Sequence, residues 1–366
     1  MVDNTISMAT QSYLGKVLIH KQLNSQGGAR VVSDLLLQNF VSADATPITP
    51  IVTAPAVKPI FGSSFIQSWY CEDWDTERWI HELSMLKDVG IKEVIIQNTV
   101  DTTPAKKFSS YNTTLVGYTS NDVDLLENAL GVADALGMKV RVGTADNDDW
   151  WSKGATDRVW LENEANTNKR IIDEITAKYA SHPSFGGWYL SYEISNITAT
   201  TSTEQANLNT FFSAIVSEIK LKTPNKTVML SPFYNSKLFI QGSLTNWAKA
   251  IETIFSGTGV DILALQDSVG TGYNAISQLS SIFAYTKKGT DAAGMELYAN
   301  TETFTSASSA NVTAPQNRIT SQIEAENKLV KGYVAFSISH FQGKCTDEAV
   351  KVDGYKDYMS YYLANR

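Results

Sequence analysis

A unit made of a short apolar run, a polar loop and a helical pattern recurs from about residue 59 to residue 342. The unit occurs eight times, and its apolar runs cover residues 60–68, 93–99, 139–145, 185–194, 227–233, 260–266, 295–301 and 332–340. Short apolar runs that alternate with helical patterns predict βαβ units and a parallel sheet. Eight units favour a closed (β/α)8 TIM barrel, an α/β fold, over an open doubly wound sheet.

The segments between these runs have apolar residues at helical spacing. We expect helices over residues 75–90, 125–136, 158–180, 203–222, 244–255, 273–286 and 315–330, and a closing helix over 355–364. Asp75 is a suitable N-cap for the first of them, and Gly90 and Gly137 are stop signals.

The first 58 residues do not follow this pattern. Residues 43–58 are rich in Pro, Ala and Thr, and proline disfavours helix in the residue before it, so this segment predicts an extended linker. Residues 1–42 would then be an N-terminal arm, too short for a confident core of its own, and residues 59–366 a TIM-barrel catalytic domain. The arm either packs on the barrel or attaches it to a larger protein assembly.

Composition excludes several classes of function. The net charge is −8 and no basic cluster is present, so we expect neither nucleic acid nor an anionic membrane as a partner. No apolar run approaches the roughly 20 residues of a transmembrane helix. No GxGxxG or GxxxxGK[ST] motif follows a predicted strand, which removes the usual argument for a nucleotide.

The start of the chain does not resemble a secretory signal peptide, because residues 1–22 have no basic stretch followed by an apolar run. We therefore expect a cytoplasmic protein, or one released by another route or as part of an assembly. Cys71 and Cys345 are not in a zinc-binding spacing. They follow the first and eighth strands, which are neighbours in a closed barrel, so a disulfide and two free thiols both remain open.

Two glutamates mark the ends of the fourth and seventh predicted strands. Because side chains alternate along a strand, Glu193 shares a face with Tyr189 and Ser191, and Glu302 shares one with Tyr298 and Asn300. Their opposite faces are apolar and should meet the helices; they comprise Trp188, Leu190 and Tyr192 in the fourth strand and Met295, Leu297 and Ala299 in the seventh.

Catalytic residues of TIM barrels lie at the C-terminal ends of the strands. Two carboxylates in one barrel mouth are the groups that cleave a glycosidic bond. A single glutamate at a strand end is more simply explained as solvated or paired with lysine, but two on non-adjacent strands of one barrel favour function.

Other polar residues also lie at predicted strand ends. Asp267 ends the sixth strand and either orients a glutamate, binds a sugar hydroxyl or caps a turn. Asp146 ends the third strand and is similar. His340 ends the eighth strand and is better explained as a hydrogen-bonding wall residue than as a metal ligand or base.

Aromatic residues gather in the same predicted loops. Sugar rings present apolar C–H faces that stack on aromatic rings, and binding pockets are often lined in this way. About half of this set is expected to be buried support for long loops and the rest an aromatic rim. The candidates are Trp69, Tyr70, Trp74, Trp150, Trp151, Phe233, Tyr234, Phe304 and Phe341.

The sequence resembles a known family in three segments, GSSFIQSWYCEDWDTERWIHELSMLKDVGIKEVIIQ, GWYLSYEI and DILALQDSVG. They are similar to an uncharacterised family of glycoside-hydrolase-like barrels catalogued as a domain of unknown function (DUF4434-like), over roughly residues 60–342. More broadly, the chain resembles the clan of retaining glycosidases.

This resemblance implies that Glu193 is the acid/base and Glu302 the nucleophile. The clan usually has Asn before the acid/base, whereas this chain has Tyr192. The role of that asparagine at the sugar 2-hydroxyl would pass to Asn300 or Gln266, or be absent.

The sequence therefore predicts a glycoside hydrolase that cleaves a polysaccharide or oligosaccharide, of the bacterial cell-surface or exopolysaccharide type, without metal or cofactor. Its substrate-binding residues would be Trp69, Tyr70, Trp74, Asp146, Trp150, Trp151, Tyr189, Tyr234, Gln266, Asp267, Asn300 and His340. The first alternative is a non-catalytic carbohydrate-binding or structural barrel, docked by residues 1–58 on an assembly such as a phage-tail-like particle. A second is another barrel enzyme, a lyase or a metal-dependent hydrolase. The lack of a His/Asp cluster at the strand ends argues against the metal-dependent version.

Overall fold

The computed structural model describes residues 58–238, 243–307 and 310–366. The expected arm at residues 1–42, and all of the expected linker except residue 58, lie outside the described residues. The described part therefore corresponds to the expected barrel domain.

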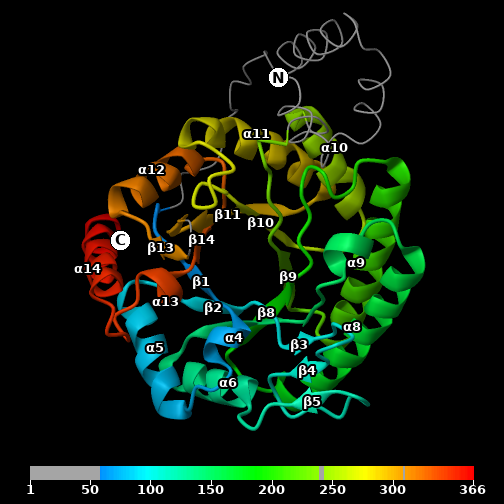
Figure 1. Ribbon diagram of the computed structural model, residues 1–366, viewed down its shortest axis with the longest axis horizontal. Helices are drawn as coiled ribbons and strands as arrows, with labels where there is room; N and C mark the ends of the chain where they lie inside the picture. Colours follow the sequence, from blue (N-terminus) through cyan, green and yellow to red (C-terminus); the bar gives the residue numbers. More distant parts are fainter. Residues whose placement is uncertain (1–57, 239–242, 308–309) are drawn as a thin grey trace, which may run out of the picture.

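Eight parallel strands close into one barrel in the order β1-β14-β11-β10-β9-β8-β6-β2. They are β1 (Ser63–Ile66), β2 (Glu93–Ile96), β6 (Lys139–Gly143), β8 (Phe185–Leu190), β9 (Thr227–Leu230), β10 (Ile262–Gln266), β11 (Glu296–Glu302) and β14 (Tyr333–Phe336). Ser63 and Ser64 pair with Val334 and Ala335, which closes the barrel. Helices surround the strands on all sides (Figure 1). The prediction of a TIM barrel is confirmed.

Most strands are shorter than the apolar runs that predicted them. The run at 332–340 contains β14, which ends at Phe336, and the chain then forms the short helix α13 (Ile338–Phe341). Ser337 caps this helix, because its side chain accepts a hydrogen bond from the backbone N–H of His340 at 3.2 Å. The prediction that His340 ends the eighth strand is therefore wrong.

The helices of the outer layer are α5 (Thr76–Asp88), α6 (Leu125–Leu136), α8 (Arg158–Tyr179), α9 (Ser202–Lys222), α10 (Leu244–Phe255), α11 (Ile276–Ala293), α12 (Gln316–Glu326) and α14 (Ala349–Asn365). Asp75 caps α5 as expected, accepting from the N–H of Arg78 at 2.8 Å. The closing helix α14 begins at Ala349, earlier than predicted, and its Tyr358 hydroxyl accepts from the N–H of Phe61 at 2.9 Å.

Helix α11 is displaced from its prediction at both ends. It begins at Ile276 and continues to Ala293, through a polar stretch that has little apolar periodicity. Gly289 lets this stretch pack closely on α10, because a Cβ there would lie 2.5 Å from the backbone oxygen of Ala248. Close approach of two helices, and not an apolar stripe, therefore buries this part of α11.

Side chains alternate between two cores, as the sequence indicates. Residues that face into the barrel form the smaller core, which comprises Phe65, Ile95, Tyr189, Met229, Ile262, Ala264 and Val334. Trp188, Leu190 and Tyr192 belong to the larger core, which also takes in the inner faces of the helices. In β11, Tyr298 packs against the smaller core, whereas Leu297 and Ala299 belong to the larger one. The predicted faces of the fourth and seventh strands are confirmed.

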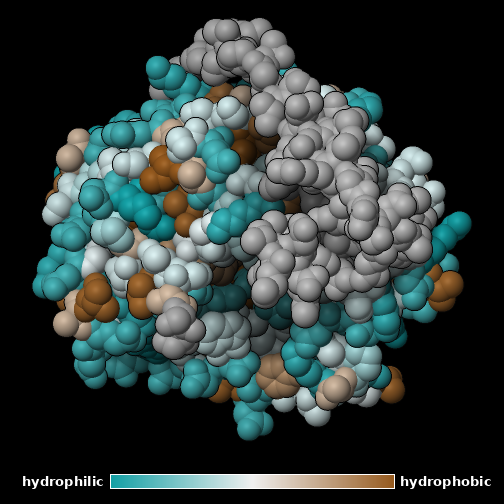
Figure 2. All heavy atoms as spheres, turned by 45° about the horizontal axis from the view of Figure 1, so that its top comes forward, coloured by the Kyte–Doolittle hydropathy of each residue, from teal (hydrophilic) through white to brown (hydrophobic). Residues whose placement is uncertain are grey.

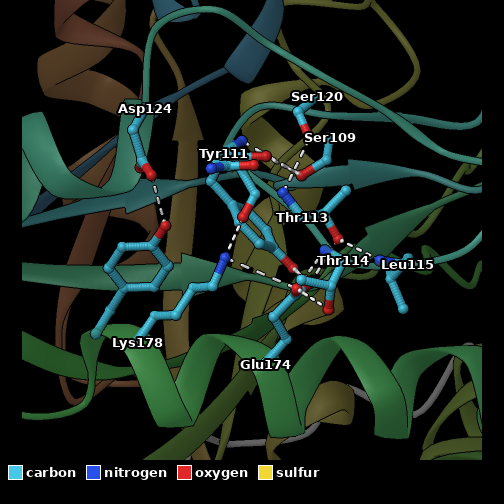
Figure 3. A network of polar contacts seen from close by, with 11 residues as sticks. Ser109, Tyr111, Thr113, Thr114, Leu115, Ser120, Asp124, Glu174 and Lys178 are labelled. Atoms are coloured by element: carbon cyan, nitrogen blue, oxygen red, sulfur yellow. Dashed lines mark hydrogen bonds and ion pairs between the residues drawn. The ribbon is translucent and has the colours of Figure 1, made fainter.

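The long polar segment after β2 forms strands β3 (Val100–Asp101), β4 (Phe108–Ser109) and β5 (Thr119–Ser120). Together with β7 (Ala145–Asp146), which follows β6 and pairs with β3, they make a small four-stranded sheet. Glu174 of α8 fastens this segment to the barrel (Figure 3). Its carboxylate accepts from the Tyr111 hydroxyl at 3.0 Å, the Thr113 hydroxyl at 2.5 Å and the Thr114 N–H at 2.5 Å. Burial alone would raise the pKa of Glu174, but these hydrogen bonds together outweigh it and lower the pKa.

Cys71 and Cys345 are both free thiols, so the structure has no disulfide between them. The Cys345 Sγ instead lies 3.9 Å from the Met85 Sδ. Within the described ranges, no helix has the length and apolar character to cross a membrane. In the space-filling view, hydrophobic residues form separate patches on a mostly hydrophilic surface (Figure 2).

Candidate active site

Glu193 lies in the segment that follows β8, at the C-terminal end of the barrel, and is partly exposed. The Nε2 of Gln266, the last residue of β10, donates a hydrogen bond to its Oε1 at 3.0 Å. The indole N–H of Trp150 donates to its backbone oxygen at 2.6 Å. Burial raises the pKa of Glu193 to about 7, the Gln266 hydrogen bond lowers it, and the charge of Asp146 raises it further. A carboxyl of this kind holds a proton near neutral pH, as a general acid must.

Glu302 is the last residue of β11 and is only 3% exposed. Its Oε2 accepts from the backbone N–H of Thr271 at 2.8 Å. Gly270 lets this loop approach, because a Cβ there would lie 2.3 Å from the Phe304 backbone oxygen and 2.9 Å from the Glu302 Oε2. Burial, together with the charge of Asp267, raises the pKa of Glu302 to about 8.

Asp267 is fully buried behind Glu302 and does not line the mouth. Its Oδ1 accepts from the N–H of Val269 at 3.1 Å and that of Glu302 at 3.3 Å, and its Oδ2 accepts from Gln322 Nε2 at 2.5 Å. The expectation that Asp267 binds a sugar hydroxyl is therefore wrong, because its oxygens are already engaged within the wall. Asp267 instead caps the turn and holds the backbone of Glu302, which are two of the roles that the sequence left open.

Helix α12 supplies the rest of this support. Gln322 Nε2 also donates to the backbone oxygen of Glu302 at 3.2 Å, and Arg318 Nη2 donates to the same oxygen at 3.0 Å. Glu326 of this helix is fully buried, and burial and the charge of Asp267 raise its pKa well above the ordinary value. Sequence patterns contain no signal for Arg318, Gln322 or Thr271, because the role of these residues depends on which loop and helix pack behind β11.

A second set of hydrogen bonds connects the inner faces of β10 and β11. Gln266 and Asn300 are paired in register, and both reach Ser231 after β9. Gln266 Nε2 donates to the Ser231 backbone oxygen at 2.8 Å, and Asn300 Nδ2 donates to the Ser231 Oγ at 2.9 Å. Asn300 is 1% exposed, so its predicted contact with substrate is not available in this arrangement. Gln266 remains partly exposed beside Glu193.

Tyr192, the residue before Glu193, faces away from the mouth. Its hydroxyl donates to Glu164 Oε1 at 2.7 Å and accepts from Asn168 Nδ2 at 2.7 Å, both in α8. Tyr192 therefore fixes the segment before Glu193 to the outer layer and cannot contact a sugar.

Asp146 is partly exposed, and its Oδ1 accepts from the N–H of Asn147 at 2.9 Å. Burial raises the pKa of Asp146, and its own charge contributes to the raised pKa of Glu193. Asp146 and Glu193, both predicted site residues, thus lie close enough to interact electrostatically.

The predicted aromatic residues divide into a buried and an exposed group. Trp74, Trp150 and Tyr234 are at most 8% exposed and belong to the larger core, and Tyr189 belongs to the smaller one. These side chains fill the layers under the loops and the interior of the barrel, and their predicted contact with substrate stays a prediction. Trp69 and Trp151 are each 63% exposed, and Tyr70 is partly exposed.

His340 is a wall residue, as expected. Its Nε2 accepts from the N–H of Gln67 at 3.2 Å, and its ring stacks on Tyr70 with centroids 4.1 Å apart. Burial lowers the pKa of His340 to about 4, so the ring is neutral at neutral pH. No group of three or more His, Cys, Asp or Glu side chains in the described part of the chain is arranged to hold a metal ion.

Residues 61–347 match the family described as "Domain of unknown function (DUF4434)". The chain belongs to this family. No curated protein matches the chain in sequence. The DUF4434 match covers the whole barrel from the first strand to the segment after α13.

Solved structures similar to this DUF4434 barrel include proteins named as glycoside hydrolases. One from Bacteroides thetaiotaomicron VPI-5482, named "putative alpha-L-fucosidase", has a TM-score of 0.72 and 24% identity, and the match covers 88% of this chain and 99% of that one. Beta-galactosidases from Marinomonas ef1 and Rahnella sp. R3 each have a TM-score of 0.52, with 10% and 11% identity. These matches cover 83% and 84% of this chain but 59% and 56% of theirs. At such identities the similarity establishes the shared barrel fold.

Proposed function

We propose that this protein is a glycoside hydrolase that cleaves a polysaccharide by a retaining mechanism with two carboxyl groups. The observation that best supports this is the presence of both Glu193 and Glu302 at the C-terminal end of one barrel. They follow or end the non-adjacent strands β8 and β11, and both have raised pKa values. Groups with perturbed pKa values at that end of a barrel are candidates for catalysis.

In the first step, a Glu302 carboxylate oxygen bonds to the anomeric carbon while the glycosidic C–O bond breaks, and Glu193 gives its proton to the leaving oxygen. In the second step, Glu193 takes a proton from water, the water oxygen bonds to the anomeric carbon, and the bond to Glu302 breaks. Gln266 would orient Glu193 through its 3.0 Å hydrogen bond, and Thr271 would orient Glu302.

Variants separate the two roles. Glu302→Ala removes the nucleophile and should stop both steps, and azide should restore turnover with a product of inverted configuration. Glu193→Ala removes the proton donor, so substrates with activated leaving groups should lose less rate than natural glycans. Losses should reach at least the 10²–10⁴-fold range of general acid–base catalysis, as an order of magnitude. Wild-type turnover in both variants on a confirmed substrate would exclude these assignments.

The burial of Glu302 supports one other candidate, a non-catalytic barrel that only binds a glycan. At 3% exposure, and with Oε2 bonded to Thr271, this carboxyl is well shielded for a nucleophile. A glycan that binds wild-type protein without ever releasing reducing ends would favour this second candidate.

A further inference from the structure

Exposed aromatic side chains occur at one end of the barrel. Among the described residues, eleven large hydrophobic side chains are exposed, and Trp69, Trp151 and Tyr273 are the aromatic ones. Trp69 lies in α4 (Ser68–Cys71), which follows β1, and Trp151 lies in α7 (Trp150–Lys153), which follows β6 and β7. Tyr273 lies in the loop that follows β10. All three therefore follow strand ends at the face where Glu193 and Glu302 lie.

The first aromatic group, the Trp151 row, consists of Trp151, Phe233 and Tyr273. The Trp151 and Phe233 ring centroids are 6.4 Å apart, and those of Phe233 and Tyr273 are 6.2 Å apart. The three residues come from the loops after β6, β9 and β10, so the row extends past the end of β8, which leads to Glu193.

The second group, the Trp69 cluster, consists of Trp69, Tyr70 and His340. The Trp69 ring lies 5.8 Å from Tyr70 and 5.6 Å from His340, centroid to centroid, and Tyr70 stacks on His340. Tyr70 and His340 are held by the wall, whereas Trp69 is 63% exposed above them. The cluster belongs to the ends of β1 and β14.

The closed strand order places the two groups on opposite sides of the barrel. In the order β1-β14-β11-β10-β9-β8-β6-β2, strands β1 and β14 lie half a circuit away from β9 and β8, which are the middle of the arc from β10 to β6 that carries the Trp151 row. Trp151 itself follows β6, two strands from β1. Glu302 ends β11 and Glu193 follows β8, so a line from the Trp69 cluster to the Trp151 row crosses the mouth that holds both carboxyl groups.

Burial does not explain why Trp69 and Trp151 are tryptophan, since most of each ring is outside the core. Flat aromatic faces suit the apolar C–H faces of sugar rings. Asp146 and Glu193 are the acidic groups of the mouth, whereas the exposed Asp148 beside them is paired with Lys106 at 2.9 Å. The carboxyl groups of Asp146 and Glu193 disfavour an anionic glycan.

We infer that the protein binds an extended, neutral glycan chain across the barrel mouth, with sugar units on the Trp69 cluster and on the Trp151 row at the same time. Such binding predicts that the glycan is cleaved inside its chain and not at its end. This consequence rests on the proposed function.

Binding should be measured by titration calorimetry in Glu193→Gln protein, which keeps the mouth but should not turn over. The probes are cellohexaose, xylohexaose, mannohexaose and laminarihexaose, each compared with its own disaccharide, and hexagalacturonate as the anionic probe. We expect at least one neutral hexaose to bind more tightly than its disaccharide. Trp69→Ala and Trp151→Ala should each weaken hexaose binding about five- to tenfold. Leu221→Ala, which removes a 72% exposed side chain on α9, should have no effect.

The inference is overturned if no neutral hexaose binds, if none binds more tightly than its disaccharide, if only one tryptophan matters, or if hexagalacturonate binds best. It is also overturned if wild-type protein releases only single sugars from the end of a hexaose that it cleaves. The proposed function fails separately. A hexaose bound through both tryptophans but never cleaved refutes the hydrolase and leaves the binding mode standing.

Discussion

At the residue scale, the two glutamates differ mainly in what surrounds them. Glu193 is partly exposed and bonded to the side chain of Gln266, whereas Glu302 is buried and bonded to the backbone of Thr271. Raised pKa values of about 7 and about 8 mean that both carboxyls are protonated at mildly acidic pH. The proposed mechanism needs Glu302 ionised and Glu193 protonated, so it predicts that only a minority of molecules is in the productive state at any pH.

The pH dependence of kcat/KM should therefore be bell-shaped, with limbs near the two pKa values of about 7 and about 8. Gln266→Leu removes the hydrogen bond that favours ionised Glu193, so its pKa should rise. Asp267→Asn removes the charge that disfavours ionised Glu302, so that pKa should fall. Steady-state kinetics should be measured from pH 5 to 10, a range chosen to span both groups. The pH optimum of kcat/KM should shift in opposite directions in the two variants, upward in Gln266→Leu and downward in Asp267→Asn. Identical profiles in all three proteins would contradict these assignments.

Glu302→Gln should stabilise the protein, and more so as the pH rises. The folded-state pKa of Glu302 is raised to about 8, so the native state holds this proton where the unfolded chain has lost it. The stability contributed by protonated Glu302 is therefore lost as the pH increases through the folded value. A neutral amide removes this loss. Thermal unfolding should give similar Tm values for variant and wild type at pH 4, and a Tm several degrees higher for the variant at pH 9. An equal difference at both pH values would show that ionisation is not the cause.

At the scale of elements, the sequence predicted the eight strands because apolar runs and helical patterns alternate without a gap from Ile60 to His340. The sequence also predicted that Glu193 and Glu302 lie on inward faces, because inward and outward side chains alternate regularly along β8 and β11. It could not predict that Asp267 and Asn300 would be buried. Asp267 is bonded to Gln322 of α12 and Asn300 to Ser231 after β9, and both partners come from distant parts of the chain. For the same reason it could not separate Trp74, Trp150 and Tyr234 from the exposed Trp69 and Trp151.

Helix α12 should affect catalysis without contacting substrate. Gln322→Leu removes the donor to Asp267 and to the backbone of Glu302, so the end of β11 loses part of its support. We expect a lower kcat with little change in KM, and a loss of about 1–3 kcal/mol in the free energy of unfolding, measured by urea denaturation. Ser321→Ala, at a partly exposed position of the same helix, is the control. A Gln322→Leu enzyme with unchanged kcat would show that this support is not needed.

Glu174 should hold the segment after β2 in place. Glu174→Ala removes the acceptor for the Thr114 N–H and for the Tyr111 and Thr113 hydroxyls. Hydrogen–deuterium exchange should then become faster at residues 111–115, while Glu162→Ala, an exposed position on α8, leaves it unchanged. Unchanged exchange in Glu174→Ala would show that the small sheet holds the segment without this residue.

At the scale of the whole molecule, the described residues already close the barrel. β1 pairs with both β14 and β2, and α14 covers the start of β1 through the hydrogen bond between Tyr358 and Phe61. We therefore expect deletion of residues 1–55 to change the Tm by no more than a few degrees, as measured by calorimetry. A chain that fails to fold without these residues would show that they belong to the core.

The proposal that this DUF4434 barrel is a hydrolase is tested most directly by release of reducing ends from a broad panel of plant and bacterial glycans. Wild type, Glu193→Gln, Glu302→Gln and Glu296→Gln should be compared on each glycan. Glu296 is an exposed glutamate at the opposite end of β11 and is the matched control for Glu302. The account predicts at least one glycan that wild type and Glu296→Gln cleave at equal rates and that the other two variants do not cleave measurably. Equal cleavage by all four proteins, or no cleavage of any glycan by wild type, would contradict it.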